Sequence, residues 1–197
     1  VSSPHGINSL TYTLNGGPVK TLSVGRNNRR LEQDGDFNVD LDIDDLNNGT
    51  NQLVIMAVDG QGTQLSETVT INFSDNNVWP QPYTINWNSV SNVSSVVQIT
   101  DGHWAIGADG LRTTQIGYDR AVAIGDMTWK DYEVVVPIVL HSVDFAGAGG
   151  VSGTPGLGIL MRWHGHTDDP NPGDQPKQGW LPHGEIGWWR WNSDQST

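Results

Sequence analysis

Four consecutive residues near the end of the sequence, Trp188-Trp189-Arg190-Trp191, carry its strongest aromatic signal. If they form a strand, alternation places Trp189 and Trp191 on one face, with Glu185 further back along it. Such a surface suits sugar rings, whose C–H faces pack on indoles while charged groups bond the hydroxyls. The alternative is that these Trp residues fill a core. Nine Trp is many for one core, however, and each buried indole N–H needs a partner.

Two other segments carry basic, imidazole and carboxylate groups at alternating positions. The first has Arg162, His164 and His166, and the second has His183 and Glu185. If the two segments are neighbouring strands, these groups could converge on zinc or another transition metal. The alternative is a polar face without a metal. The predicted ligand-binding residues are therefore Arg162, His164, His166, Glu185, Trp189 and Trp191.

Acidic residues gather in two places and suggest calcium, which takes six to eight oxygen ligands. Asp168, Asp169 and Asp174 lie in one Pro- and Gly-rich loop and are the predicted metal ligands. A second acidic stripe alternates with apolar residues and consists of Asp40, Asp42, Asp44 and Asp45. Neither group has the fixed spacing of an EF-hand loop. The alternative for the stripe is the solvated face of a half-buried strand.

These residues must be positioned by strands. Runs of β-branched and aromatic residues recur between Gly, Asn and Asp clusters, and the chain has 24 Gly and 10 Pro. This spacing predicts an all-β fold made of sandwiches. Cysteine is absent, so each module must be stabilised by its hydrophobic core. Zero Cys with few Lys suits a protein that a bacterium exports.

The composition divides the chain near residue 76. All nine Trp lie after that point, and the polar run 74–77 makes a natural linker. We therefore expect one module over 1–75 and a second over 76–197. In the first, residues 37–43 alternate as a strand. In the second, residues 107–110 are expected to form a hairpin turn and residues 159–164 a strand. Tyr132–Leu140 is the apolar run of a central strand, although Pro137 favours an edge or a bulge.

The net charge of −12 argues against nucleic acid as a partner. Nucleic-acid binding needs a basic footprint, so none is expected. No apolar run approaches ~20 residues, so no membrane insertion is expected. Sugars, neutral polymers and divalent cations remain. The first residue is Val1, and the start lacks a signal-peptide pattern, so we expect a piece of a longer protein.

Two resemblances refine this prediction. "SLTYTLNGGP", "GDFNVDLDIDDLNNGTNQLVIMAVDGQG" and "ETVTINF" resemble bacterial immunoglobulin-like and cadherin-like repeats. "GYDRAVAIGDMTWKDYEVVVPIVLHSVD", "PGLGILMRWHGHTDD" and "GWLPHGEIGWWRW" resemble a concanavalin A-like (laminin-G-like) lectin/glucanase domain. The resemblances imply a small Ig-like sandwich followed by a jelly roll. Because ~120 residues supply few strands for that fold, we expect the second module to be incomplete at its C-terminus. Two explanations stay open for the missing part: removal by proteolysis, or completion by another chain.

The resemblance also bears on catalysis and on calcium. Glucanases of this fold carry their acids in a Glu-x-Asp-x-x-Glu pattern. Here Glu185 is present, but Gly187 stands where the Asp should be and Arg190 stands in place of the later Glu. The paired acid that glycoside hydrolysis needs is absent, so no catalytic residue is predicted. Related jelly rolls often hold a structural calcium ion, but its ligands do not map onto this sequence.

The sequence thus predicts a non-catalytic carbohydrate-binding or adhesion segment of a large secreted or cell-surface bacterial protein. Residues 1–75 would act as a spacer, and the second module would bind a glycan or polysaccharide. Two alternatives stay open. One is a fragment of a polysaccharide hydrolase or lyase. The other is a structural repeat of a filament or surface layer.

Overall fold

The computed structural model describes residues 1–27, 29–76, 79–118, 120–145, 154–168, 173, 175–180, 184–192 and 194. The fold is all-β, as predicted, and among the described residues its helical parts are three single 3₁₀ turns. Two compact units are present, and each is considered by itself. The first joins Val1–Asp75 with Gly158–Trp188, and the second joins Asn76–Leu157 with Trp189–Thr197. Within the described residues no helix is long and apolar enough to span a membrane.

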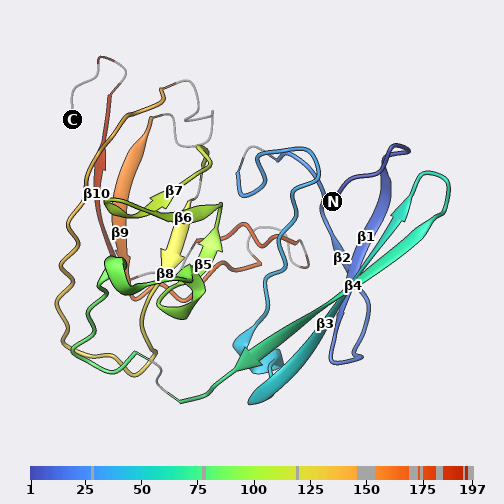
Figure 1. Ribbon diagram of the computed structural model, residues 1–197, viewed down its shortest axis with the longest axis horizontal. Coiled ribbons are helices and arrows are strands. Elements are labelled where there is room, and N and C mark those ends of the chain that lie inside the picture. The colour runs from blue at the N-terminus through green and yellow to red at the C-terminus, as the bar shows by residue number, and fades with distance from the viewer. Residues whose placement is uncertain are drawn as a thin grey trace. The chain divides into compact units, whose positions relative to one another are not determined.

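A four-stranded antiparallel sheet with the order β2-β1-β3-β4 forms the centre of the first unit (Figure 1). Its strands are β1 (Ile7–Leu14), β2 (Lys20–Leu22), β3 (Gly49–Asp59) and β4 (Gln64–Phe73). One face buries a small apolar cluster made of Leu10, Tyr12, Leu22 and Leu53. Burial of these apolar side chains is the main force that holds this unit together.

An irregular segment covers the buried face of this sheet. Phe37, Val39 and Leu41 pack against the core cluster, so the alternation seen in the sequence does place them on one face. The predicted strand over 37–43 is nevertheless not formed. Ile43 is 60% exposed and begins the 3₁₀ turn Ile43–Asp45, labelled η1. Backbone and side-chain groups of Asp40, and the side chain of Asp42, bond residues 175–177 in place of a strand ladder.

The buried side-chain amide of Asn51 ties together the backbone and side chains at one end of the sheet. Asn51 in β3 is fully buried, and its Oδ1 accepts hydrogen bonds from Asn15 Nδ2 and from the backbone N–H of Asn47, both at 2.8 Å. Its Nδ2 donates to the carbonyls of Asn47 and Gly49. Both polar atoms of this side chain are hydrogen-bonded, and these bonds compensate the desolvation cost of burying it.

The second unit contains two small antiparallel ladders, β5 with β8 and β6 with β7. Its short elements are η2 (Trp87–Ser89), η3 (Val93–Ser95), β5 (Gln98–Asp101), β6 (Trp104–Gly107), β7 (Gly110–Thr113) and β8 (Ala121–Ala123). The hairpin between β6 and β7 was predicted from the sequence and is confirmed. Two indole N–H groups, of Trp104 and Trp129, donate to the carbonyls of Asp101 and Trp79.

The apolar run Tyr132–Leu140 is not the central strand that the sequence predicts. It lies in no strand, and every residue from Glu133 to Ser142 is exposed. Figure 1 draws it as a long golden trace without an arrow. A β-strand needs a neighbour for its backbone groups, and the described residues supply none here.

The last two strands, β9 (Gly156–Met161) and β10 (Glu185–Arg190), pair with each other. The division between the two units falls within both strands. At Gly158 a Cβ atom would lie 2.7 Å from Trp188 Cβ and 3.0 Å from the Gly187 carbonyl oxygen. Glycine is therefore required at this point, because any side chain would force the two strands apart.

Candidate functional site

An open apolar groove lies in the second unit, with a volume of about 210 Å³. Its lining residues are Ile138, Leu140, Leu157, Trp189 and Trp191. The two Trp residues come from the end of β10 and the residue just beyond it. The backbone N–H of Trp191 donates to the carbonyl of Pro155 at 3.0 Å, so the pairing with the β9 side continues past Arg190. This pairing holds the two indoles at alternate positions on one side of the chain.

The indoles of β10 are unusually accessible. Trp189 is 56% exposed and Trp188 is 51% exposed. A Trp side chain offers ~200 Å², so leaving half of it in water forgoes about 2.5 kcal/mol of hydrophobic stabilisation. Neither side chain therefore fills a core. Large aromatic side chains held in water on a strand are available for a ligand.

Arg162 and His164 lie just beyond the end of β9, and both are exposed. The strand predicted over 159–164 runs instead from Gly156 to Met161, because Arg162 takes a left-handed φ of 56° that ends the extended geometry. The stem of Arg162 passes close to Gly184, where an added Cβ would lie 3.2 Å from Arg162 Cδ. Glu185 opens β10 and is exposed.

His166 is placed differently from His164. Its ring lies edge-on to Trp163 and Trp180, with centroids 5.0 Å and 4.6 Å away, and these two indoles stack at 4.9 Å. Nδ1 of His166 lies 3.1 Å from the carbonyl oxygen of Gly179, and Trp163 Nε1 donates to the carbonyl of Trp180. The cluster is partly buried within the first unit. It lies beside the antiparallel bridge between Thr167 and Gly179.

Four of the predicted ligand-binding residues therefore belong to the first unit, and two belong to the second. Arg162, His164, His166 and Glu185 form the first group, and Trp189 and Trp191 form the other. The structure brings Trp189 and Trp191 to one groove. Sequence reasoning missed the groove residues Ile138 and Leu140, because the run that contains them was interpreted as a buried strand.

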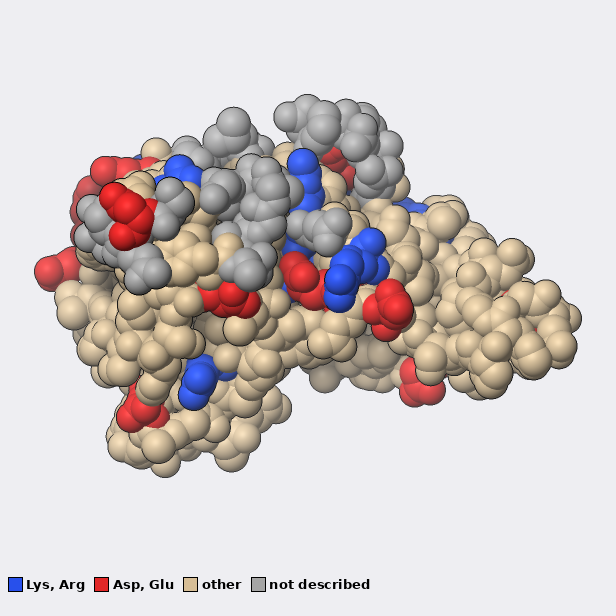
Figure 2. Space-filling view, turned by 90° about the horizontal axis from the view of Figure 1, so that it is seen from above, with Lys and Arg blue, Asp and Glu red and all other residues tan. Residues whose placement is uncertain are grey.

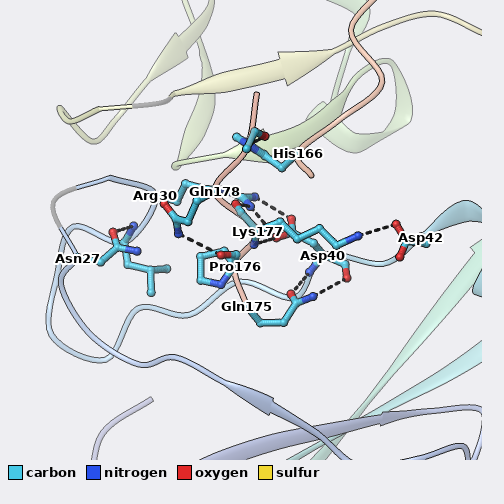
Figure 3. Close-up of polar contacts among 11 residues, drawn as sticks. Asn27, Arg30, Asp40, Asp42, His166, Gln175, Pro176, Lys177 and Gln178 are labelled. Atoms are coloured by element: carbon cyan, nitrogen blue, oxygen red, sulfur yellow. Dashed lines mark hydrogen bonds and ion pairs between the residues drawn. The ribbon is translucent and has the colours of Figure 1, made fainter. Parts of the chain in front are cut away.

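A buried ionic network lies in the first unit and holds the segment 175–177 (Figure 3). Arg30 is 3% exposed, and its Nη1 and Nη2 donate to the two carboxylate oxygens of Asp40 at 2.5 and 2.8 Å. Arg30 Nη1 also donates to the carbonyl of Lys177, and the Lys177 N–H donates to Asp40 Oδ2. Gln175 adds a pair of bonds between its amide and the Asp40 backbone.

Lys177 completes the network through its side chain. Nζ donates to Asp42 Oδ1 at 2.6 Å. Burial by itself would lower the pKa of Lys177, but the hydrogen bond and charge of Asp42, with the charges of Asp168 and Asp40, outweigh it. The pKa of Lys177 is therefore raised above its ordinary value. The neutral form is disfavoured, and the ion pair persists at physiological pH.

The acidic stripe predicted as a possible calcium site is largely paired with the chain's own cations. Asp40 pairs with Arg30, Asp42 with Lys177, and Asp45 with Lys20 at 3.4 Å. Across the part of the chain that the structure describes, no three His, Asp or Glu side chains converge as a metal site would require.

The predicted metal ligands lie only partly within the structure. Asp168 is exposed, whereas Asp169 and Asp174 lie outside the described residues. His183, one of the residues considered as a zinc ligand, also lies outside them.

On the face drawn in Figure 2, Lys and Arg atoms form small separate areas, several of them next to Asp or Glu.

No protein-family model, no curated protein and no solved structure matches this chain.

Proposed function

We propose that this chain is a non-catalytic carbohydrate-binding segment of a large secreted or cell-surface bacterial protein. Its N-terminal sheet would be an Ig-like or cadherin-like spacer, and the residues after 76 would be a concanavalin A-like jelly roll. The observation that carries the proposal is the half-exposed indole of Trp189 beside Trp191 over an open apolar groove.

The openness of the groove favours a sugar over a wholly apolar ligand. A sugar ring has an apolar C–H face and a rim of hydroxyl groups. The face can pack on Trp189 and Trp191 while the hydroxyls stay hydrated in the open mouth of the groove. An entirely apolar molecule needs an enclosed pocket that covers most of its surface. The groove supplies contact on one side only.

The proposed binding step uses no metal. The groove residues carry no carboxylate or imidazole, and among the described residues no metal-ligating cluster is present. A structural calcium ion held through Asp168, Asp169 and Asp174 is a separate proposal, motivated by the acidic loop of the sequence.

A broad glycan array tests the proposed function. The purified chain is expected to bind at least one glycan class and to release that glycan chemically unchanged. Trp189→Ala is expected to abolish the binding signal. A second array with a chelator present separates a structural calcium from the groove. A blank array with the intact chain would contradict the proposal, and turnover of a bound glycan would favour a fragment of a hydrolase or lyase.

A further inference from the structure

An apolar run with an unpaired backbone crosses the second unit at Glu133–Leu140. Within the described residues, none of its backbone N–H or C=O groups takes part in a hydrogen bond. Its apolar side chains are exposed, and Val135 reaches 78%. A row of unpaired backbone groups is a template for another strand, and exposed apolar side chains make its addition favourable.

We propose that a second copy of this chain supplies the missing strand, through antiparallel pairing of the two Glu133–His141 segments. Such a dimer has a two-fold axis, so a residue that contacts another in one copy is contacted by it in return. The axis passes through Pro137, which faces Pro137 of the second copy. Val135 then faces Val139, and Glu133 faces His141.

This register accommodates Pro137, which has no backbone N–H to donate. In an antiparallel pair, opposite residues alternate between hydrogen-bonded and non-hydrogen-bonded positions. With Pro137 at a non-hydrogen-bonded position, its missing N–H costs nothing. Val136 then exchanges bonds with Ile138, and Val134 exchanges bonds with Leu140. Each of these pairs forms two backbone hydrogen bonds.

Charge complementarity favours the same register. The apolar run is bounded by Glu133 at one end and His141 at the other. In the single chain His141 Nε2 lies 3.5 Å from Asp109 Oδ2, so in the dimer Glu133 joins or replaces that carboxylate as its partner. Antiparallel pairing about Pro137 places a carboxylate opposite an imidazole at both ends of the ladder. The imidazole N–H donates to the carboxylate, and its protonated form adds an opposite charge. A shift by two residues would set Glu133 opposite Val139 or Val143 and lose both pairs.

The pairing edge is distinct from the proposed glycan groove. Ile138 and Leu140 line the groove with their side chains, whereas the new ladder uses the backbone. Successive side chains of a strand point to opposite faces, so Val135 and Val139 lie on the other side. The self-association therefore goes beyond the proposed function and does not depend on it.

Cysteine cross-linking tests the register directly, because the chain contains no Cys. In a Pro137→Cys variant the two thiols face each other across the axis. Their Cα atoms are ~4.5 Å apart at a non-hydrogen-bonded position, within the range of a disulfide. In the matched variant Val135→Cys, the thiols are offset by four residues, or ~13 Å, beyond that range. Under mild oxidation we expect a covalent dimer from the first variant and monomer from the second.

The mass in solution tests the dimer itself. Light scattering on the wild-type chain at high micromolar concentration is expected to give twice the chain mass. Salt near 0.15 M screens the repulsion between two chains of net charge −12, because the Debye length is then about 8 Å. Glu133→Lys should weaken the dimer at least tenfold. A wild-type chain that stays monomeric at every soluble concentration, or equal cross-linking by both Cys variants, would overturn the proposal.

Discussion

The guanidinium of Arg30 and the carboxylate of Asp40 form a two-bond ion pair in the first unit, with Nη2 and Oδ1 2.8 Å apart. The same carboxylate accepts from the Lys177 N–H, so one pair of side chains joins residues that are 137 positions apart in the sequence. Removal of Arg30 would leave the Asp40 charge partly buried without its main partner. We expect Arg30→Met to lower the free energy of unfolding by about 3 kcal/mol, measured by urea denaturation.

A double variant tests whether the loss comes from an unpaired buried charge. Arg30→Met with Asp40→Leu removes both charges and should restore part of the loss, because no uncompensated charge remains. Arg29→Met is the control, since Arg29 precedes Arg30 and is only partly buried. A loss in the control as large as in Arg30→Met would refute the role assigned to the network.

Alkaline pH should weaken the first unit. Burial opposes the charge of Lys177, but Asp42, Asp168 and Asp40 together outweigh it, and the folded state raises the pKa of Lys177. This stabilisation is present below pH 10.5 and is lost as the pH rises through the folded pKa. Burial also raises the pKa of Tyr12. Above pH 10.0 the unfolded chain loses a proton that the folded state retains, and folding becomes less favourable.

Both effects act in one direction, so the free energy of unfolding should fall above about pH 10. Urea denaturation at a series of alkaline pH values measures this fall. In Lys177→Met the decline should be shallower, because one of the groups with a raised pKa is gone, while Tyr12 and Lys20 remain. An equal slope in the variant would show that Lys177 does not contribute.

Asn51 offers a test of the sheet itself. Its buried amide bonds Asn15, Asn47 and Gly49, so Asn51→Leu would leave several of their polar groups without partners. We expect a loss of about 3 kcal/mol in the free energy of unfolding. The exposed Asn72→Ala on β4 should change it by less than about 0.5 kcal/mol. Comparable losses in both variants would contradict this assignment.

The sequence predicted the local elements best where the signal was short-ranged. The alternation of Phe37, Val39 and Leu41 correctly indicated a shared buried face, and the turn over 107–110 was correctly placed. Both features depend on neighbours in the chain. The all-β class follows from the same local signals, summed over many short segments.

Long-range relationships were not visible in the sequence. Nothing in the spacing of Asp40 indicates that it bonds Arg30 and the backbone of Lys177, because such pairs require a fold to bring them together. The apolar run that contains Val135 was predicted as a central strand, since its hydrophobicity is that of a buried one. Hydrophobicity alone does not show whether a pairing strand is present.

A chelator should leave the groove unchanged. Its lining residues carry no metal ligand, so glycan affinity should stay within about twofold when EDTA replaces calcium, as calorimetry would show. A large loss of affinity with an unchanged fold would instead place a cation in the binding surface. A large loss together with lower thermal stability would indicate a structural ion in the acidic loop.

Titration of Trp189→Ala with a glycan that the array identifies tests the central claim most directly. Trp188→Ala is the matched control, since its indole is similarly exposed and adjacent but points to the opposite face of β10. The account predicts at least a tenfold loss of affinity in Trp189→Ala, about 1.4 kcal/mol, and near wild-type affinity in Trp188→Ala. Wild-type affinity in a folded Trp189→Ala variant would contradict it.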